Sequence, residues 1–383
     1  MVCQYRFSMK RKRPERIIFA GLLAAFFFSY VPTAISDTVP FNSDRWVIKS
    51  KESKIIQYLG RTTLYLSSGV ALVKDSDLTD GIIEFDIACT GERGYMGVLW
   101  RALDDHNFEN FYIRPHQSGN PDANQYQPVF NDNDAWQLYY GEDYSAPIKY
   151  DFNQWMHIKI IVSSANAEIY IKDMEHPALL VNLKRETKSG KVGLQVGDAA
   201  PGYFSNFTYT AIDHPPLKGQ PKSPRPAAIG TVIRWQVSNP IDGKSLDNKF
   251  RLTAKDKQPL TWQTLGSENT GITNLGKLHG LAEGADTVFA RVIIVADQEQ
   301  IKRIQFGFSD QVKAYFNDQL IYGGNDRYRS RDYRFLGTVG FFDELYLPLK
   351  KGENELWLAV TENFGGWGVL AKFDDITGIM LKP

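Results

Sequence analysis

The chain has 383 residues, of which 43% are hydrophobic and 13% aromatic, enough to build two or three packed domains and to exclude a disordered chain. Its 44 basic and 44 acidic residues balance, but residues 1–36 hold six Lys and Arg against one acid. The remainder therefore has 38 basic and 43 acidic residues, a net charge of −5. A mildly acidic protein without a basic stripe is not expected to bind nucleic acid.

The N-terminus has the pattern of a secretory signal peptide. A basic run at 10–13 precedes an apolar stretch at 17–31, and the small residues Ala34 and Ser36 stand at the −3 and −1 positions of a cleavage site. The stretch is too short for a stable membrane span. We therefore expect residues 1–36 to be removed and the protein to be periplasmic or secreted, the alternative being an uncleaved anchor.

The cysteines agree with a fold that needs no disulfide. Cys3 leaves with the signal peptide, so Cys89 is alone and no intramolecular disulfide can form in the mature chain. Cys89 has the same parity as Phe85 and Ile87, which predicts a small buried side chain rather than a nucleophile.

After the signal peptide, apolar residues alternate with polar ones, which is the spacing of half-buried β-strands. Turn residues such as Asp80-Gly81 and Ser189-Gly190 separate the alternating segments. Many short strands with turns about ten residues apart predict a β-sandwich or jelly roll. The segments are 81–87, 156–162, 169–171 and 192–196.

A boundary follows this region. Residues 213–226 contain five prolines and several basic residues, a composition that stays extended and cannot bury a core. We interpret 213–226 as a Pro-rich linker between a domain at 37–212 and a domain at 227–383.

Beyond the linker the alternation resumes, and Asn317-Asp318 has the composition of a tight turn between two strands. The sequence therefore predicts an all-β protein of two β-sandwich (jelly-roll) domains joined by the linker. The alternating segments of the second domain are 233–237, 288–294, 304–308, 312–316, 356–360 and 369–373.

The first domain resembles the concanavalin A-like lectin/glucanase superfamily, particularly laminin-G-like modules, over most of 41–211. The resemblance is carried by the runs GIIEFDI (81–87), GVLWRALDDHNFENFYIR (97–114) and WMHIKIIVSSANAEIYI (155–171). It implies a lectin-like β-sandwich.

The second domain looks like the galactose-binding-like jelly rolls appended to glycosidases. The matching runs are VKAYFNDQLIYGG (312–324) and LYLPLKKGENELWLAVTENFGGWG (345–368). A shared fold does not by itself imply a shared function.

The densest group of polar and aromatic residues lies at 111–126. In a strand, Tyr112, Arg114 and His116 share one face, opposite Phe111 and Ile113. Such a face suits a sugar, whose C–H groups stack on aromatic rings while its hydroxyls take directional hydrogen bonds. The alternative is a structural network that braces a long loop. The candidate ligand-binding residues of this domain are Arg101, Tyr112, Arg114, His116, Gln125, Tyr126 and Trp136.

Two carboxylates on one strand raise the question of hydrolysis. Glucanases of the superfamily carry alternating acids on a strand, since two of them must flank the scissile bond. Glu84 and Asp86 match part of that pattern, but Ala88 or Cys89 stands where the third acid belongs. We therefore expect Glu84 and Asp86 to lie on a solvated or hydrogen-bonded strand face.

Acidic loop clusters raise calcium. Asp104, Asp132 and Asp134 offer the hard oxygen ligands that calcium prefers. The alternative, which we favour, is that these Asp and neighbouring Asn residues form local turns. We expect no required cofactor, with a structural calcium ion as the alternative.

Two segments of the second domain stand out, 327–334 and 363–368. The first is rich in arginine and suits an anionic sugar, although a charged loop is more often solvated. In the second, glycines around Trp367 would let its ring project as a stacking platform.

The leading hypothesis is an exported carbohydrate-binding protein whose partner is a polysaccharide or oligosaccharide. No metal-ligand spacing, nucleophile elbow or phosphate loop is present in the sequence, so we do not expect an enzyme. The enzyme alternative is a glycoside hydrolase or polysaccharide lyase with its site near His116 and Asp122. A further alternative is a module that binds a protein partner.

We predict that the protein isolated after export begins at Asp37. The small residues Ala34 and Ser36 fit the cleavage site, so intact mass measurement should find the chain without residues 1–36. An exported form that retains Met1 or Met9 would contradict this prediction.

Overall fold

The computed structural model describes residue 1 and residues 37–332 and 336–382. The expected signal peptide, 1–36, lies outside the described residues apart from Met1. The described residues from Asp37 onward belong to one compact unit, Ile35–Pro383. In this part of the chain, no helix has the length and apolar character needed to cross a membrane.

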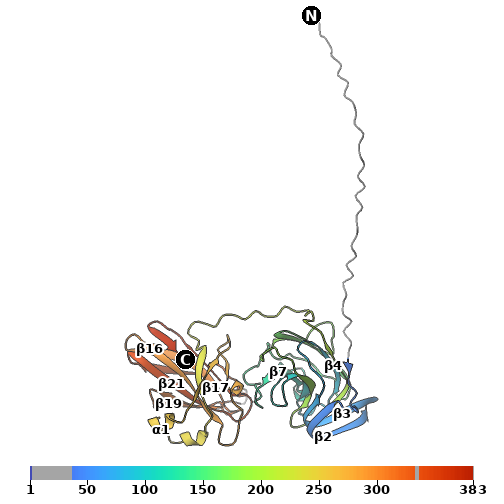
Figure 1. The fold of residues 1–383 in the computed structure, drawn as a ribbon, viewed down its shortest axis with the longest axis horizontal. Helices are drawn as coiled ribbons and strands as arrows, with labels where there is room; N and C mark the ends of the chain where they lie inside the picture. The colour runs from blue at the N-terminus through green and yellow to red at the C-terminus, as the bar shows by residue number, and fades with distance from the viewer. Residues whose placement is uncertain (2–36, 333–335, 383) are drawn as a thin grey trace. The chain divides into compact units, whose positions relative to one another are not determined.

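The fold is all-β, as predicted, with antiparallel strands throughout (Figure 1). The first twelve strands form one network, in the order β10-β9-β8-β4-β12-β3-β11-β5-β6-β7, with β1 beside β12 and β2 beside β3. These strands are β1 (Asp37–Thr38), β2 (Trp46–Tyr58), β3 (Arg61–Val73), β4 (Gly81–Ala88), β5 (Met96–Ala102), β6 (Phe108–Ile113), β7 (Asn124–Val129), β8 (Met156–Ser163), β9 (Asn166–Ile171), β10 (Leu179–Asn182), β11 (Lys191–Val196) and β12 (Gly202–Ala211).

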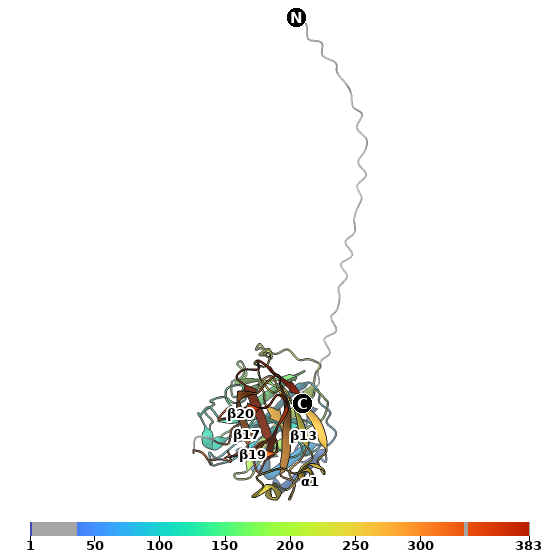
Figure 2. The ribbon, with the colours of Figure 1, turned by 90° about the vertical axis from the view of Figure 1, so that its left-hand side faces the viewer.

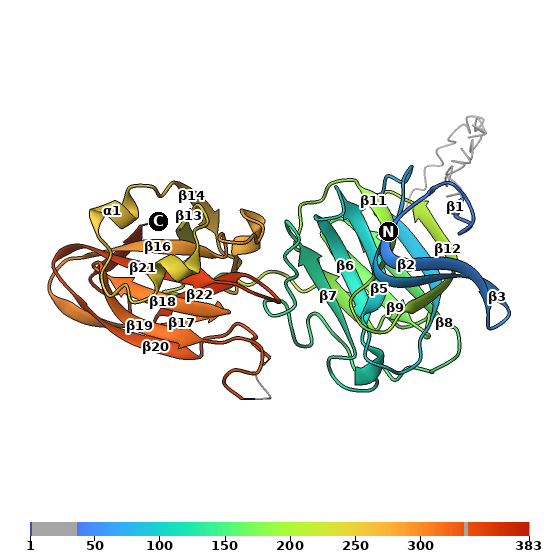
Figure 3. The same cartoon turned by 90° about the horizontal axis from the view of Figure 1, so that it is seen from below.

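This sheet closes over one apolar core. Phe85 of β4 and Ile158 of β8 meet Val98, Phe111 and Leu194 from the β5–β6–β11 side in a single buried cluster. The strands β11, β5, β6 and β7 lie side by side in Figure 3. Successive side chains of each strand therefore point alternately into the core and to the outer face of the sheet. The candidate site lies on the outer face.

The remaining strands form two sheets. One has the order β14-β13-β16-β21-β18-β19 with β23 beside β16, and the other has the order β15-β22-β17-β20. Figure 2 labels β13 and β19 of the first sheet and β17 and β20 of the second. The elements are β13 (Arg234–Ser238), η2 (Gly243–Leu246), α1 (Ala254–Lys257), β14 (Trp262–Gly266), β15 (Thr273–Asn274), η3 (Leu275–Lys277), β16 (Thr287–Ala296), β17 (Gln300–Ser309), β18 (Gln311–Phe316), β19 (Gln319–Asn325), β20 (Asp343–Leu349), β21 (Gly352–Thr361), β22 (Gly368–Phe373) and β23 (Ile379–Lys382). Trp235 and Leu358 of the first sheet pack against Phe306 and Val369 of the second in one core.

The turn at Asn317-Asp318 and the buried Cys89 are as the sequence predicts. Asn317 and Asp318 join β18 to β19 with φ of 48° and 72°, the left-handed conformation that a two-residue hairpin turn needs and that Asn and Asp tolerate. Cys89 is fully buried, and burial raises its pKa to about 12. Its thiol is therefore protonated and unreactive at neutral pH.

The segment 213–226 contains no strand, and it lies against the first sandwich. The backbone N–H of Gly219 donates to Glu168 at 2.5 Å, and Asn182 donates to the carbonyl of Lys222 at 2.9 Å. Within the described residues no strand of β1–β12 pairs with one of β13–β23. The domain boundaries 37–212 and 227–383 stay a prediction.

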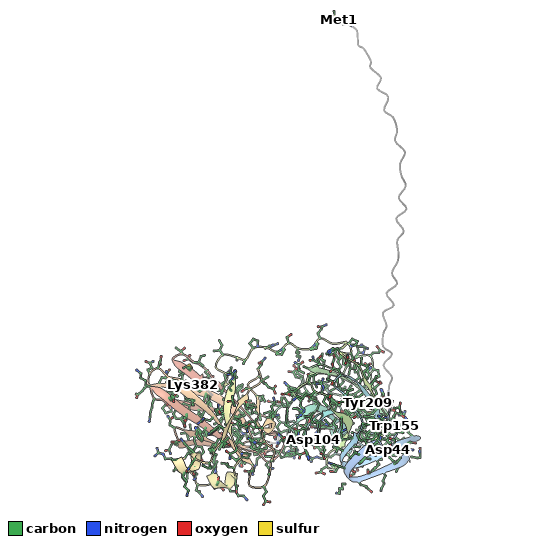
Figure 4. All side chains as sticks on the ribbon, viewed as in Figure 1. Met1, Asp44, Asp104, Trp155, Tyr209 and Lys382 are labelled. Atoms are coloured by element: carbon green, nitrogen blue, oxygen red, sulfur yellow. The ribbon has the colours of Figure 1, made fainter. Side chains whose placement is uncertain are left out.

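Side chains nevertheless connect the part of the chain before the segment 213–226 with the part after it. Leu138 and Tyr139 form an apolar cluster with Ile272, Val339 and Leu370. The Tyr139 hydroxyl also donates to Glu268 at 2.5 Å. The residues before and after the segment 213–226 therefore share a small apolar cluster, separate from the two main cores. Figure 4 labels Asp104 and Trp155 on the first sandwich and Lys382 on the second.

Trp367 lies inside the second core, which differs from the expected stacking platform. Its ring is fully buried, and its Nε1 donates to the carbonyl of Val360 at 3.0 Å. The glycines beside it instead let Leu138 and Ala135 approach the backbone at Gly366. Trp367 is therefore a core residue and cannot stack on a ligand in this conformation.

We predict that Trp367→Ala lowers the free energy of unfolding by about 3–5 kcal/mol, because it leaves a large cavity in the core. Urea denaturation of the variant and the parent protein measures the difference. Tyr346→Ala is the control, since Tyr346 is 62% exposed and its loss should change stability by less than about 0.5 kcal/mol. A cost for Trp367→Ala as small as the control's would show that the ring is not part of the core.

Candidate functional site

The outer face of β6 and β7 is polar but hardly exposed to solvent. Phe111, Ile113 and Tyr126 point into the core, so Tyr112 and Gln125 point outward together with Gln127. Gln125 and Gln127 are each only 3% exposed. A buried amide costs free energy unless it is hydrogen bonded, so these side chains need protein partners.

The loop after β7 supplies those partners. The Nε2 of Gln125 donates to the carbonyls of Trp136 at 3.0 Å and Tyr139 at 2.5 Å. Gln127 donates to Asp134 at 2.9 Å and accepts the backbone N–H of Ala135 at 3.1 Å. The two glutamines therefore fix the backbone of this loop against the sheet, and Trp136 is held in a defined position.

Trp136 meets two aromatic residues that are distant in sequence. Its ring centroid lies 6.2 Å from that of Tyr328 and 5.8 Å from that of Phe364, and all three pairs of rings are edge to face. Tyr328 is 37% exposed and Phe364 is 51% exposed. We call Trp136, Tyr328 and Phe364 the aromatic patch.

Hydrogen bonds hold the backbone of the loop that carries Phe364. The carboxylate of Asp310 accepts the backbone N–H groups of Asn363 at 3.0 Å and Phe364 at 3.1 Å. The N–H of Gln137 donates to the carbonyl of Gly365 at 2.9 Å, which ties this loop to the loop that carries Trp136. These hydrogen bonds thus hold the backbone of Phe364 beside the loop that carries Trp136.

A polar row adjoins the aromatic patch. Arg93 donates to the hydroxyl of Tyr95 at 3.1 Å, and the Tyr95 ring lies 5.5 Å from His116. The Tyr95 ring lies 6.0 Å from that of Tyr112, which stands opposite Gln125, the residue that holds the carbonyl of Trp136; these contacts place Tyr95 beside the residues that support the aromatic patch. We call Arg93, Tyr95 and His116 the polar row.

His116 is neutral at pH 7. Burial lowers its pKa below the ordinary 6.5, and the positive charges of Arg93 and Arg114 act in the same direction. Its Nδ1 is buried without a hydrogen-bond partner among the described residues. A neutral imidazole can both donate and accept a hydrogen bond, which suits a hydroxyl group.

Arg114 does not face solvent. As parity predicts, it lies opposite Ile113, but it is only 8% exposed. Its guanidinium donates to the Tyr112 hydroxyl at 2.9 Å, to the carbonyl of Asp122 at 3.0 Å and to the side chain of Gln125. Arg114 therefore braces the layer beneath the polar row, the bracing role that was the alternative in the sequence analysis.

Besides Trp367, two predicted binding residues lie away from this site. Arg101 is 2% exposed and pairs with Asp80 at 2.9 Å, and Tyr126 is fully buried with its hydroxyl donating to Glu109 at 2.7 Å. The structure thus brings together Tyr112, Arg114, His116, Gln125 and Trp136, and it separates Arg101, Tyr126 and Trp367 from them.

The candidate catalytic residues do not form a recognisable pair. Among the described residues no hydrogen bond joins His116 to Asp122. Glu84 and Asp86 instead bind His157, at 3.4 Å and 2.8 Å. Asp86 also accepts from Asn206 at 2.6 Å. These contacts agree with the hydrogen-bonded strand face expected for the two acids.

The carboxylates of the three calcium candidates contact neighbouring protein groups. Asp104 accepts the backbone N–H of His106 at 2.9 Å, and Asp132 lies 2.6 Å from the His106 ring. Asp134 binds Gln127, and burial raises its pKa to about 6. In the part of the chain that the structure describes, no three His, Cys, Asp or Glu side chains gather in a way that could hold a metal ion. A structural calcium ion stays the alternative to the expectation that no cofactor is required.

Sequence reasoning identified both second-domain segments, 327–334 and 363–368, but not their contact with Trp136. It missed Arg93 and Tyr95, which follow a glycine-containing turn and carry no motif of their own. Only tertiary contacts bring Tyr95 to His116 and Tyr112.

We predict that Arg114→Ala destabilises the protein by about 1–3 kcal/mol, because it leaves the Tyr112 hydroxyl and the Gln125 carbonyl without a donor in a buried layer. Urea denaturation measures the loss, and Arg225→Ala in the exposed 213–226 segment is the control. A variant as stable as the control would show that the guanidinium is not a brace and return it to the ligand-binding candidates.

No protein-family model matches the chain, and no curated protein matches it. Among solved structures, a carbohydrate-binding module, CBM66, from Bacillus subtilis is similar at 18% identity, over 44% of this chain and 98% of that one, with a TM-score of 0.35. A protein of unknown function with a galectin-like fold from Bacillus subtilis aligns at 11% identity over 43% and 88%, with a TM-score of 0.33.

A xylan beta-1,4-xylosidase from Bacillus halodurans C-125 aligns at 13% identity over 46% of this chain and 38% of that one, with a TM-score of 0.33. All three TM-scores lie below 0.5, so these similarities do not decide the function of this chain. The resemblance to the concanavalin A-like and galactose-binding-like families stays a prediction.

Proposed function

We propose that this protein binds a carbohydrate on the surface formed by the aromatic patch and the polar row. The observation that carries the proposal is the cluster of Trp136, Tyr328 and Phe364, of which two are more than a third exposed although aromatic rings are usually buried. Exposed apolar clusters on a folded protein mark places where a ligand or partner covers them.

The chemistry of the neighbouring groups favours a sugar over a purely apolar ligand. The C–H face of a pyranose packs on an aromatic ring, and its hydroxyls need donors and acceptors at the rim of that contact. Arg93 supplies donors, the Tyr95 hydroxyl supplies both, and the neutral imidazole of His116 supplies its other ring nitrogen, since Nδ1 is buried. The aromatic patch would therefore bind the ring face while the polar row reads the hydroxyls.

The pattern at the N-terminus extends the proposal to location. A protein exported behind a signal peptide would meet polysaccharides of the cell envelope or the surroundings. We therefore include periplasmic or secreted action in the proposal, with a polysaccharide or oligosaccharide as the partner.

We predict that Trp136→Ala and Tyr328→Ala each weaken glycan binding by roughly 5- to 30-fold, since each removes a stacking contact worth about 1–2 kcal/mol. Affinity electrophoresis against cell-wall and plant polysaccharides finds the ligand, and titration calorimetry then measures the dissociation constants. Tyr346→Ala removes an exposed aromatic ring that contacts none of the patch rings among the described residues, and it should leave the affinity unchanged.

Each alternative function has its own result in the same experiments. No binding to any polysaccharide would overturn the proposal. Capture of a defined protein partner that added sugars do not displace would replace it with an interaction module. Release of reducing ends that His116→Ala or Asp122→Asn abolishes would replace it with a glycoside hydrolase or lyase.

A further inference from the structure

A second hollow lies apart from the aromatic patch. It is a cavity of about 340 Å³, large enough for a monosaccharide-sized ligand. Five cationic side chains line it against a single carboxylate. The lining residues are Arg101, Leu103, Asn107, Phe130, Asn131, Lys184, Arg185, Glu186, Lys188 and Lys277.

Three of the five cations are already paired. Arg101 pairs with Asp80 at 2.9 Å, Lys184 with Glu268 at 2.7 Å and Lys188 with Glu186 at 2.5 Å. These pairs leave two cations, Arg185 and Lys277, whose charge is not balanced by an ion pair among the described residues.

Arg185 is held in place without a carboxylate. Its Nη1 donates to the carbonyl of Val129 at 2.6 Å, and its guanidinium lies 4.5 Å from the centroid of the Phe130 ring. The charges of Glu109 and Asp104 also act on Arg185. However, Glu109 is fully buried, and burial raises its pKa. Burial thus disfavours the charged form of Glu109, which weakens its attraction for Arg185. Asp104 is engaged by Asn107 and His106.

Lys277 is placed against the same ring from η3. Its Nζ lies 5.5 Å from the Phe130 centroid and has no hydrogen-bond acceptor among the residues the structure describes. An ammonium group has three donors, so an unpaired one in a sheltered position retains unused capacity. Arg185 and Lys277 therefore flank one aromatic ring at the cavity with unused positive charge.

Burial makes the unpaired positive charges of Lys277 and Arg185 less favourable. Loss of hydration is the first cause that lowers the pKa of both Lys277 and Arg185. The charge of Glu268 raises the pKa of Lys277, but Glu268 is already paired with Lys184 at 2.7 Å. In addition, the Nη1 of Arg101, which also lines the cavity, is buried without a partner. A cation removed from water is stabilised when an anion joins it, and more so where the dielectric is low.

We infer that this cavity is a binding site for a small oxyanion, a carboxylate, sulfate or phosphate group, contacted by Lys277 and Arg185. The anion accepts from the ammonium of Lys277 and from the free donors of Arg185. The remaining volume admits a ring of monosaccharide size, so the oxyanion can be an inorganic ion or the charged group of an acidic sugar. This inference does not depend on the aromatic patch.

The probes are sodium sulfate, D-glucuronate and the neutral analogue D-glucose, titrated into the purified protein at constant ionic strength set with sodium chloride. We expect an anionic probe to bind and glucose not to bind at this site. Binding of sulfate and glucuronate would identify a general oxyanion site, and binding of glucuronate alone a site for carboxylated sugars.

Lys277→Ala should weaken binding of the anionic probe about tenfold or more, since a charge-assisted hydrogen bond is lost. Lys277→Arg keeps the charge and should stay within a few-fold of the parent. Lys255→Ala removes an exposed lysine of α1 that does not line the cavity and should have no effect. Thermal melting shows whether each variant is folded.

If Lys277→Ala fails to fold, Arg185→Gln removes the other unpaired cation and should cause a comparable loss. Three results would overturn the inference: no anionic probe binds, glucose binds as tightly as glucuronate, or a folded Lys277→Ala protein binds the anion as tightly as the parent. Loss of glycan binding in the patch variants has no bearing on these outcomes, so the two sites are tested separately.

Discussion

The fully buried side-chain amide of Gln137 is the constraint on which the candidate site depends. It donates to the carbonyl of Leu336 at 2.9 Å and accepts the hydroxyl of Ser309 at 2.9 Å. An amide buried without such partners would cost about 1–3 kcal/mol, so the buried position of Gln137 is favourable only when residues of the second half of the chain contact it. The same loop carries Trp136, so the hydrogen bonds of Gln137, together with those of Gln125 and Asp310, position the rings of the aromatic patch.

The sequence was informative wherever a periodicity of two decides the structure. Ile83, Phe85 and Ile87 are all buried, as their spacing predicts, because a strand with one buried face has only one favourable register. Asn317 and Asp318 form the expected hairpin turn because few other residues tolerate a positive φ. Local rules therefore gave the all-β class and the positions of many strands.

The candidate site was less accessible to the same rules. Parity placed Arg114 on the outer face of its strand, but it cannot reveal that a later loop covers that face. Glycines beside Trp367 suggested a projecting ring, whereas they serve the close approach of Leu138. The meeting of Trp136 with Tyr328 and Phe364 depends on contacts between residues nearly two hundred or more positions apart, which no local pattern encodes.

The loop after β7 contributes to both proposed ligand sites. Phe130 and Asn131 line the cationic cavity, while Trp136 belongs to the aromatic patch. Each site is completed from the second half of the chain, by Lys277 in one case and by Tyr328 in the other. Asn133 adds a further link, since its Nδ2 donates to the carbonyl of His279 at 3.0 Å. Each half has an apolar core of its own, but a half taken alone would lack part of both sites. The proposed binding therefore depends on the contact between the halves more directly than the stability of either core does.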